Sequence, residues 1–194
     1  MLSEIASILP KLVRDVPRGR DWLYDLKLDG FRGTLYVEEQ RGRFRPKTKN
    51  PMRRFDAPAN AIARELNVRD VILDREIVVM SEGRPDFYAL MMNRKPPSFI
   101  AFDVLWLNGR DLRGLPLRRR KRELEKLATA GQVQTVEMTH DRRLIDAVVQ
   151  MDLEGIVAKR GADPYAPTTE WLKVKHAEYS QKEGRGDLFH RRRT

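Results

Sequence analysis

The stretch Lys27-Leu28-Asp29-Gly30-Phe31-Arg32 separates two apolar runs, at residues 22–26 and 35–37. An Asp-Gly pair between apolar runs is typical of a tight turn, because glycine adopts positive φ angles at little cost. The pattern therefore predicts a β-hairpin with a lysine at the end of its first strand. A lone lysine at such a place is commonly a solvated loop residue, so any further role depends on the rest of the chain.

The composition is that of a folded and strongly basic protein. The 194 residues are 41% hydrophobic and 34% charged, and 38 Lys and Arg against 28 Asp and Glu give a net charge of +10. Such an excess favours a polyanionic partner such as nucleic acid. The lack of cysteine excludes a disulfide framework and a Cys-ligated zinc site. Because we find no signal peptide and no apolar stretch of membrane length, we expect a cytoplasmic protein.

The hydrophobic pattern predicts one α+β domain without an internal repeat or linker. Helices are expected at residues 1–14, interrupted by Pro10, and at 56–67, 116–130 and 141–151. Strands are expected at residues 71–80, 99–107, 154–159 and 171–175. Asp56 would cap the second helix, Gly131 would end the third, and Met151 would face inward on the fourth. We expect the basic run 118–122 to form solvated first turns, and the polar tail after residue 175 to be a short helix or disordered.

Two charged segments call for an explanation beyond the fold. Residues 41–54 hold seven basic side chains and no acidic one. They form either a solvated loop or, as we favour because Lys27 is close in sequence, a surface that contacts phosphate groups. The strand predicted at residues 71–80 carries Asp74, Arg75 and Glu76 at its centre. Charges at such a place are costly unless they form ion pairs or bind a ligand.

Four further elements follow Lys27-x-Asp29-Gly30-x-Arg32 along the chain. They are Asp74-x-Glu76-Ile77-Val78, Phe102-Asp103-Val104-Leu105, Glu154-Gly155-Ile156-Val157-x-Lys159 and Trp171-Leu172-Lys173-Val174-Lys175. As an ordered set, they resemble the covalent nucleotidyltransferase superfamily, and most closely the adenylation domain of ATP-dependent DNA ligases. The resemblance spans about residues 20–176. It implies an α+β fold of antiparallel sheets flanked by helices, with the nucleotide site between the sheets.

The resemblance also implies roles for the matching side chains. Lys27 corresponds to the nucleophile that forms a covalent lysyl-AMP. Nucleotide contacts are implied for Asp25, Leu26, Arg32, Lys49, Glu76, Phe102, Lys173 and Lys175. Phe102 would stack on the purine, and the two C-terminal lysines would hold the α-phosphate. Glu76 and Glu154 would supply oxygen ligands for Mg²⁺ or Mn²⁺.

Three positions depart from the family pattern. Asp25 stands where the family usually has a glutamate that contacts the adenine amino group. Lys49 replaces an arginine, which keeps the charge but loses the bidentate geometry. Arg75 replaces the glycine that usually precedes the acidic residue corresponding to Glu76.

The chemistry explains why these residue types are needed. An amine attacks phosphorus only in its neutral form, and nearby cations such as Arg32, Lys173 and a divalent metal disfavour the ammonium form. The same cations neutralise the charge on the α-phosphate during its transfer.

The expected function is that of an ATP-dependent DNA ligase core. It would transfer AMP from Lys27 to a 5′-phosphate at a DNA nick or break, which is then sealed. DNA contacts are expected from Arg41, Arg43, Arg45, Lys47, Arg53 and Arg54, with the arginine-rich tail adding to them. The expected partners are nicked or broken DNA and a separate DNA-repair protein, and the protein is expected to be a monomer that binds no membrane. An RNA ligase, a GTP-using capping enzyme and a non-catalytic nucleic-acid-binding module stay open as alternatives.

One expected difference from the ligases concerns domain organisation. In the ligases, an OB-fold domain follows the last of these strands, whereas 19 residues follow Lys175 here, too few for such a barrel. We therefore expect an adenylation domain over residues 1–176, a basic tail over residues 177–194, and no OB-fold domain.

Overall fold

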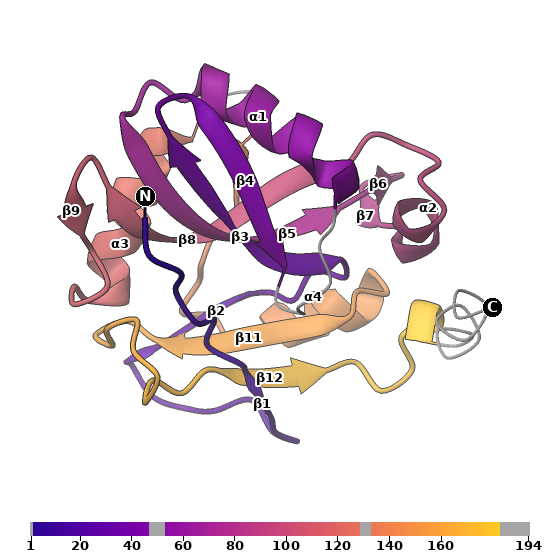
Figure 1. The fold of residues 1–194 in the computed structure, drawn as a ribbon. Helices are drawn as coiled ribbons and strands as arrows, with labels where there is room; N and C mark the ends of the chain where they lie inside the picture. The colour runs from indigo at the N-terminus through magenta and orange to yellow at the C-terminus, as the bar shows by residue number, and fades with distance from the viewer. Residues whose placement is uncertain (1, 47–52, 129–132, 183–194) are drawn as a thin grey trace.

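The structure, a computed structural model, describes residues 2–46, 53–128 and 133–182 (Figure 1). The larger of its two main sheets has the strand order β10–β8–β5–β3–β4, with β9 paired to β8. Its strands are β3 (Phe31–Glu38), β4 (Arg41–Pro46), β5 (Asp70–Val78), β8 (Ser98–Leu107), β9 (Arg110–Asp111) and β10 (Val133–Thr135). The smaller main sheet has the order β1–β12–β11–β2, formed by β1 (Lys11–Leu12), β2 (Trp22–Leu26), β11 (Gly155–Arg160) and β12 (Leu172–Lys175). A two-stranded ribbon joins β6 (Met80–Ser81) to β7 (Arg84–Pro85).

Most strand pairs are antiparallel, and β1–β12 and β10–β8 are the parallel pairs among the described strands. The predicted strands are confirmed as β5, β8, β11 and β12, and the α+β class with antiparallel sheets is confirmed with them.

Apolar residues from the two main sheets meet between the sheets. Tyr36 of β3, Ile72 of β5 and Leu105 of β8 pack in one buried cluster with Trp171 and with the partly buried Val157 of β11. Alternate residues of the same strands point to the opposite side of each sheet. The helices cover those outer sides, so that the molecule is built in layers around the space between the sheets (Figure 1).

The helices are α1 (Asp56–Glu65), α2 (Phe87–Met91), α3 (Leu117–Leu127) and α4 (Leu144–Gln150), with short 3₁₀ turns η1 (Arg53–Phe55) and η2 (Ser180–Lys182). The first three contribute to the core of the larger sheet, and α4 covers the smaller sheet. The helices predicted at 56–67, 116–130 and 141–151 are thus confirmed. Asp56 is the first residue of α1 and does not cap it, Met151 is half exposed, and Gly131 lies outside the described residues. Among the described residues, none of the helices has the length and apolar character needed to cross a bilayer.

The helix predicted at residues 1–14 is wrong. The described part of this segment is extended, and it crosses from the larger sheet to the smaller one before it forms β1 (Figure 1). Its backbone groups bond to side chains of the core: Ile5 N donates to Tyr36 Oη at 2.8 Å, and Ile8 N donates to Tyr165 Oη at 3.3 Å. Tertiary bonds of this kind satisfy the backbone without a helix, and Pro10 would have interrupted one.

The hairpin predicted around Lys27 is also wrong. Strand β2 pairs with β11 in the smaller sheet, and β3 pairs with β4 and β5 in the larger sheet. The Asp-Gly turn therefore carries the chain from one sheet to the other. Gly30 is required there, because a Cβ atom would lie 2.1 Å from the carbonyl oxygen of Ile77. The crossing places Lys27 at the junction of the two sheets.

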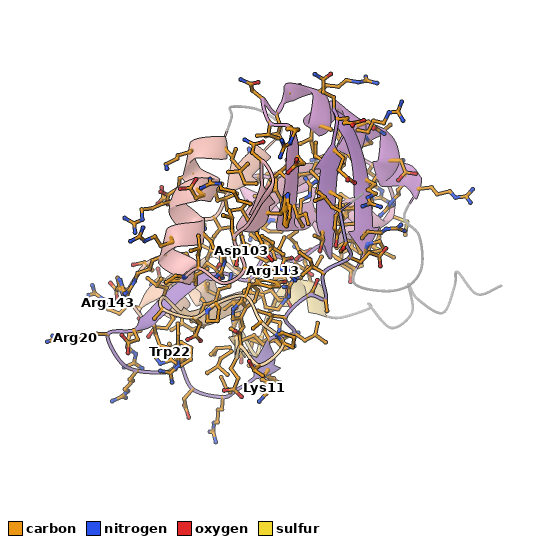
Figure 2. The ribbon with its side chains drawn as sticks, turned by 60° about the vertical axis from the view of Figure 1, so that its left-hand side comes forward. Lys11, Arg20, Trp22, Asp103, Arg113 and Arg143 are labelled. Carbon is orange, nitrogen blue, oxygen red and sulfur yellow. The ribbon has the colours of Figure 1, made fainter. Side chains whose placement is uncertain are left out.

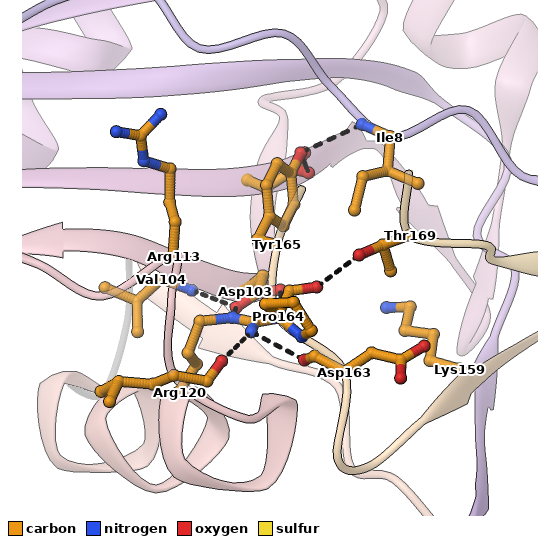
Figure 3. Close-up of polar contacts among 12 residues, drawn as sticks. Ile8, Asp103, Val104, Arg113, Arg120, Lys159, Asp163, Pro164, Tyr165 and Thr169 are labelled. Carbon is orange, nitrogen blue, oxygen red and sulfur yellow. Dashed lines mark hydrogen bonds and ion pairs between the residues drawn. The ribbon is translucent and has the colours of Figure 1, made fainter. Parts of the chain in front are cut away.

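The basic run at the start of α3 is not fully solvated, contrary to our prediction. Arg120 has no exposed surface, and its Nε and Nη2 donate to the two carboxylate oxygens of Asp103 at 2.8 and 2.9 Å (Figure 3). Lys121 is also buried, and its Nζ donates to the carbonyl oxygen of Val136 at 2.5 Å. Figure 2 shows Asp103 inside the molecule, whereas Arg143 extends from its edge. Arg120 and Lys121 therefore attach α3 to the larger sheet.

Candidate active site between the two sheets

A cavity of about 290 Å³ opens between the two main sheets. Seven of the residues that the sequence singled out line it: Asp25, Leu26, Lys27, Arg32, Glu76, Phe102 and Lys173. They come from β2, the turn after it, β3, β5, β8 and β12, so segments far apart in sequence meet here. Lys49 and Lys47 lie outside the described residues.

Lys27 directly follows β2, and its backbone N donates to Gly155 O at 2.8 Å. Its Nζ donates to Glu154 Oε2 at 2.5 Å, and the other oxygen of Glu154 pairs with Lys175 Nζ at 3.0 Å. Burial raises the pKa of Glu154, but Lys27 and Lys175 outweigh that effect and hold the pKa below its usual value. The amine of Lys27 is therefore held by a buried, ionised carboxylate while 22% of the lysine side chain stays accessible.

Glu76 approaches the same region from the larger sheet, where it lies opposite Arg32. Burial raises the pKa of Glu76 to about 8, Lys27 and Arg32 oppose this rise, and Glu154 adds to it. The carboxyl group therefore lies in surroundings that supply too little positive charge to keep it ionised at neutral pH.

The two carboxylates bear on the metal site that the sequence predicted. Among the described residues, no group of three or more His, Asp or Glu side chains is arranged to hold a metal ion. Mg²⁺ is commonly bound through one or two carboxylates together with water and substrate phosphates. Glu76 and Glu154 influence each other electrostatically and face Lys27, so the donor set fits such a substrate-completed site, and an added cation would satisfy Glu76.

Arg32 is held in place by two hydrogen-bond partners. Its Nε and Nη2 donate to the carboxylate of Asp74 at 3.1 and 2.7 Å, and its Nη1 donates to Ile8 O at 2.7 Å. Burial lowers the pKa of Arg32, but the carboxylate of Asp74 more than reverses this and raises it overall. Tyr165 Oη donates to the same carboxylate at 2.6 Å. Asp74 in the middle of β5 is thus an ion-pair partner that orients Arg32 at the cavity wall.

Lys159 is a cavity residue to which the sequence assigned no role. It is almost fully buried, and its Nζ donates to Asp25 Oδ2 at 2.7 Å. Asp25 Oδ1 is buried and has no hydrogen-bond partner among the described groups. The signal was present in the sequence, because a lysine inside an otherwise apolar strand needs a buried acidic partner.

Two aromatic rings form one wall of the cavity. Phe102 and Trp171 pack edge to face, with ring centroids 6.1 Å apart, and both line the cavity. The Nζ of Lys159 lies 4.7 Å from the ring centroid of Phe102 and 4.3 Å from that of Trp171. The resemblance to the ligases implied that Phe102 stacks on a base, but no role was assigned to Trp171. Each ring can present an apolar surface to a planar ligand.

The basic run beside the cavity is partly engaged within the molecule. Its described members are Arg41, Arg43 and Arg45 of β4, and Arg53 and Arg54 of η1. Arg43 pairs with Glu38 at 3.2 Å, and Arg45 pairs with Glu4 at 3.1 Å. Arg54 lies over the ring of Phe55 at 4.6 Å. Arg41 and Arg53 are exposed, and their contact with DNA stays a prediction.

Comparison with known proteins agrees with this geometry. A profile of the ATP dependent DNA ligase domain matches residues 1–175. The multifunctional non-homologous end joining protein LigD of Pseudomonas aeruginosa is 32% identical over 187 residues, which cover 88% of this chain and 22% of that protein.

Two solved structures have the same fold. The ligase domain from M. tuberculosis LigD matches with a TM-score of 0.74 and 26% identity, over 88% of this chain and 59% of that one. A mycobacterial DNA ligase D complexed with ATP and MES matches with a TM-score of 0.68 and 25% identity, over 87% of this chain and 60% of that one. The chain therefore spans about a fifth of the LigD relative and about three fifths of the solved chains. It belongs to the ATP-dependent DNA ligase domain family.

Proposed function

We propose that this chain is the adenylation core of an ATP-dependent DNA ligase. The observation that carries the proposal is the position of Lys27, whose amine is held by Glu154 at the edge of a cavity lined by Arg32, Glu76 and Lys173. Family membership supports it, as does the solved structure of a similar ligase in complex with ATP. The substrates, the complete activity and the partners of the whole protein are part of this proposal.

In the first step, the neutral amine of Lys27 attacks the α-phosphate of ATP. An N–P bond forms, the bond to pyrophosphate breaks, and the lysine proton is released. Glu154 orients the amine before the nucleotide binds, and Lys173 and Arg32 offset the negative charge on the phosphate as it is transferred. Glu76 and Glu154 would hold a divalent metal ion, which would neutralise further phosphate charge.

The base of the nucleotide would lie against the aromatic wall. Phe102 and Trp171 offer apolar ring surface, and Asp25 Oδ1 is a buried acceptor without a donor among the described groups. The exocyclic amino group of adenine is a donor, so it would satisfy that oxygen. Lys159 would then hold the carboxylate of Asp25 in place.

In the later steps, AMP passes from Lys27 to the 5′-phosphate at a DNA nick or break. The 3′-hydroxyl on the other side of the break then attacks that phosphorus, the bond to AMP breaks, and the strand is sealed. We infer that the exposed arginines of the basic run, among them Arg41 and Arg53, contact the DNA backbone. The domain division at residue 176, the monomeric state and the cytoplasmic location stay predictions.

The decisive experiment is intact-protein mass spectrometry before and after incubation with ATP and Mg²⁺. Wild type is expected to gain the mass of one adenylyl group, and Lys27→Ala is expected to gain none. A wild type that takes up no adenylyl group with any nucleotide or divalent metal would refute the proposal and favour the nucleic-acid-binding module.

The substrates are distinguished by two further comparisons. Labelling with GTP in place of ATP would indicate a capping enzyme, and sealing only of RNA-containing nicks would indicate an RNA ligase.

Binding to nicked duplex should weaken steeply as the salt concentration rises, because phosphate contacts release counterions. Affinity for nicked duplex that is unchanged between low and high salt would exclude the proposed backbone contacts.

A further inference from the structure

The segment that follows β12 contacts the turn that carries Lys27. Tyr179 Oη donates to Asp29 Oδ2 at 3.0 Å, and each of the two residues is only 4% exposed. Asp29 lies two residues after Lys27, in the turn that crosses between the sheets. The crossing turn is therefore attached to a third part of the chain as well as to the two strands at its ends.

The next residue contacts the turn that leads to Glu154. Ser180 N donates to Asp152 Oδ1 at 3.0 Å, and Ser180 Oγ donates to the other oxygen of that carboxylate. Asp152 lies two residues before Glu154 and has a positive φ of 50°. Non-glycine residues adopt this conformation at some cost, so the bonds from Ser180 help to hold the turn.

Gln181 connects the same segment to the ribbon β6–β7 and to α2. Its Oε1 accepts from Phe87 N at 2.9 Å, and its Nε2 donates to Pro85 O at 2.8 Å. Figure 1 shows η2 beyond the end of β12, on the side of the molecule where α2 lies. Three successive residues thus contact the Lys27 turn, the Glu154 turn and the start of α2.

We propose that residues 179–181 form a latch that positions Lys27 against Glu154 for attack on the nucleotide. Tyr179 fixes the turn after the nucleophile, and Ser180 fixes the turn before its acidic partner. Gln181 anchors both to β7 and to α2, which packs on the larger sheet. The latch acts through Asp29 and Asp152 and touches neither the amine nor the cavity. This inference rests on the proposed function, since it names residues that prepare Lys27 for adenylation.

The test measures single-turnover formation of Lys27–AMP at a series of ATP concentrations in the full chain. Tyr179→Phe removes only the hydroxyl that bonds to Asp29, and Ser180→Ala removes the hydroxyl that bonds to Asp152. Each variant is expected to lower the maximal rate about tenfold, because small displacements of a nucleophile are costly. The ATP concentration for half-maximal rate is expected to stay unchanged. Glu178→Ala, at the exposed position next to Tyr179, is the control and should keep the wild-type rate.

Amide hydrogen exchange gives a second readout that does not depend on activity. Exchange in residues 27–30 is expected to be faster in Tyr179→Phe than in wild type and unchanged in Glu178→Ala. A wild-type maximal rate in Tyr179→Phe, or a change confined to the ATP concentration for half-maximal rate, would overturn the latch. If wild type forms no adduct, the proposed function fails, and exchange alone decides: unchanged exchange overturns the latch, and faster exchange supports its hold on the turn.

Discussion

Replacing Arg75 with methionine is expected to stabilise the protein. Arg75 on β5 has no exposed surface, and its three guanidinium nitrogens have no hydrogen-bond partner among the described groups. Its described neighbours include the rings of Phe99 and Phe44, whose centroids lie 4.8 and 5.9 Å from the guanidinium carbon. A buried cation without a hydrogen-bond partner lowers the free energy of unfolding, and other interactions in the fold must offset this cost.

The size of the effect follows from the surroundings of the guanidinium. Burial lowers the pKa of Arg75 far below the usual value for arginine, to about 9. At about 1.4 kcal/mol per pKa unit, the charge costs at most about 5 kcal/mol. The two rings return about 1–2 kcal/mol of this through cation–π attraction. Methionine keeps most of the apolar volume, so we expect a gain of about 2 kcal/mol near neutral pH, or about 4–8 °C in the melting temperature.

The gain should depend on pH with a definite sign. The folded-state pKa of Arg75 lies below the unfolded-state value, so the unfolded chain binds more protons between the two values. The cost of the charge is fully present below about pH 9 and declines as the pH rises above that value. Thermal melts of wild type and Arg75→Met should therefore differ most near neutral pH and converge above about pH 9.

Arg120→Met is the matched control, because Arg120 is equally buried but fully paired with Asp103. Its removal leaves a buried carboxylate without a cation, which should cost about 3–5 kcal/mol. The two substitutions are chemically identical and are expected to have opposite signs. A loss of stability in Arg75→Met comparable to that in Arg120→Met would refute the reasoning, since it would mean that the Arg75 guanidinium is satisfied.

Two further substitutions test the cavity walls. Lys159→Met should lower the free energy of unfolding by about 3–5 kcal/mol, because Asp25 stays buried without its cation. Adding Asp25→Asn should restore part of that loss in urea denaturation, and a double variant as unstable as the single one would contradict the pairing. Gly30→Ala should cost about 1–3 kcal/mol, because its Cβ would lie 2.1 Å from Ile77 O and the backbone must shift. Gly114→Ala has open space around the added Cβ and should melt like wild type, so equal melting of both variants would contradict the close approach at Gly30.

The local pattern of the sequence predicts the elements better than it predicts their partners. Runs of β-branched and apolar residues identify β5 and β8, and the spacing of leucines identifies α3. The hairpin at Lys27 was wrong because an Asp-Gly pair specifies a change of direction and not the strand that follows it in the sheet. The partner of β2 is β11, near the other end of the chain, and no local signal indicates that pairing.

The partners of buried polar groups also could not be predicted from the sequence. The apolar spacing of residues 1–14 suggested a helix, but Ile5 and Ile8 bond to tyrosine hydroxyls that tertiary folding brings to them. The arginines of α3 look alike in the sequence, yet Arg120 is buried because Asp103 of β8 faces it. A charged side chain can be buried when an oppositely charged partner lies on another element of the fold. A run of charged residues in the sequence therefore does not show which of its members are buried and which are solvated.

The candidate site residues were taken from the resemblance to the ligases, which does not depend on knowing which strands pair. The structure brings the predicted Lys27, Arg32 and Glu76 to one cavity although the predicted hairpin was wrong. Lys159 and Trp171 were not recognised as cavity residues, because a strand lysine and a core tryptophan each have an ordinary structural explanation. Their shared contact with Phe102 is visible only once β8, β11 and the residue before β12 are placed together.

The crossing of the chain between the sheets explains how Lys27 comes to lie among opposite charges. Its backbone is tied to the smaller sheet through Gly155, and its carboxylate partner Glu154 directly precedes a strand of that sheet. Glu76, whose pKa Lys27 lowers, belongs to the larger sheet. The electrostatic surroundings of the amine therefore depend on how the two sheets are packed. Contacts outside the cavity, such as that of Tyr179 with the crossing turn and those of Gln181 with β7 and α2, are therefore proposed to affect the reactivity of Lys27 without touching the nucleotide.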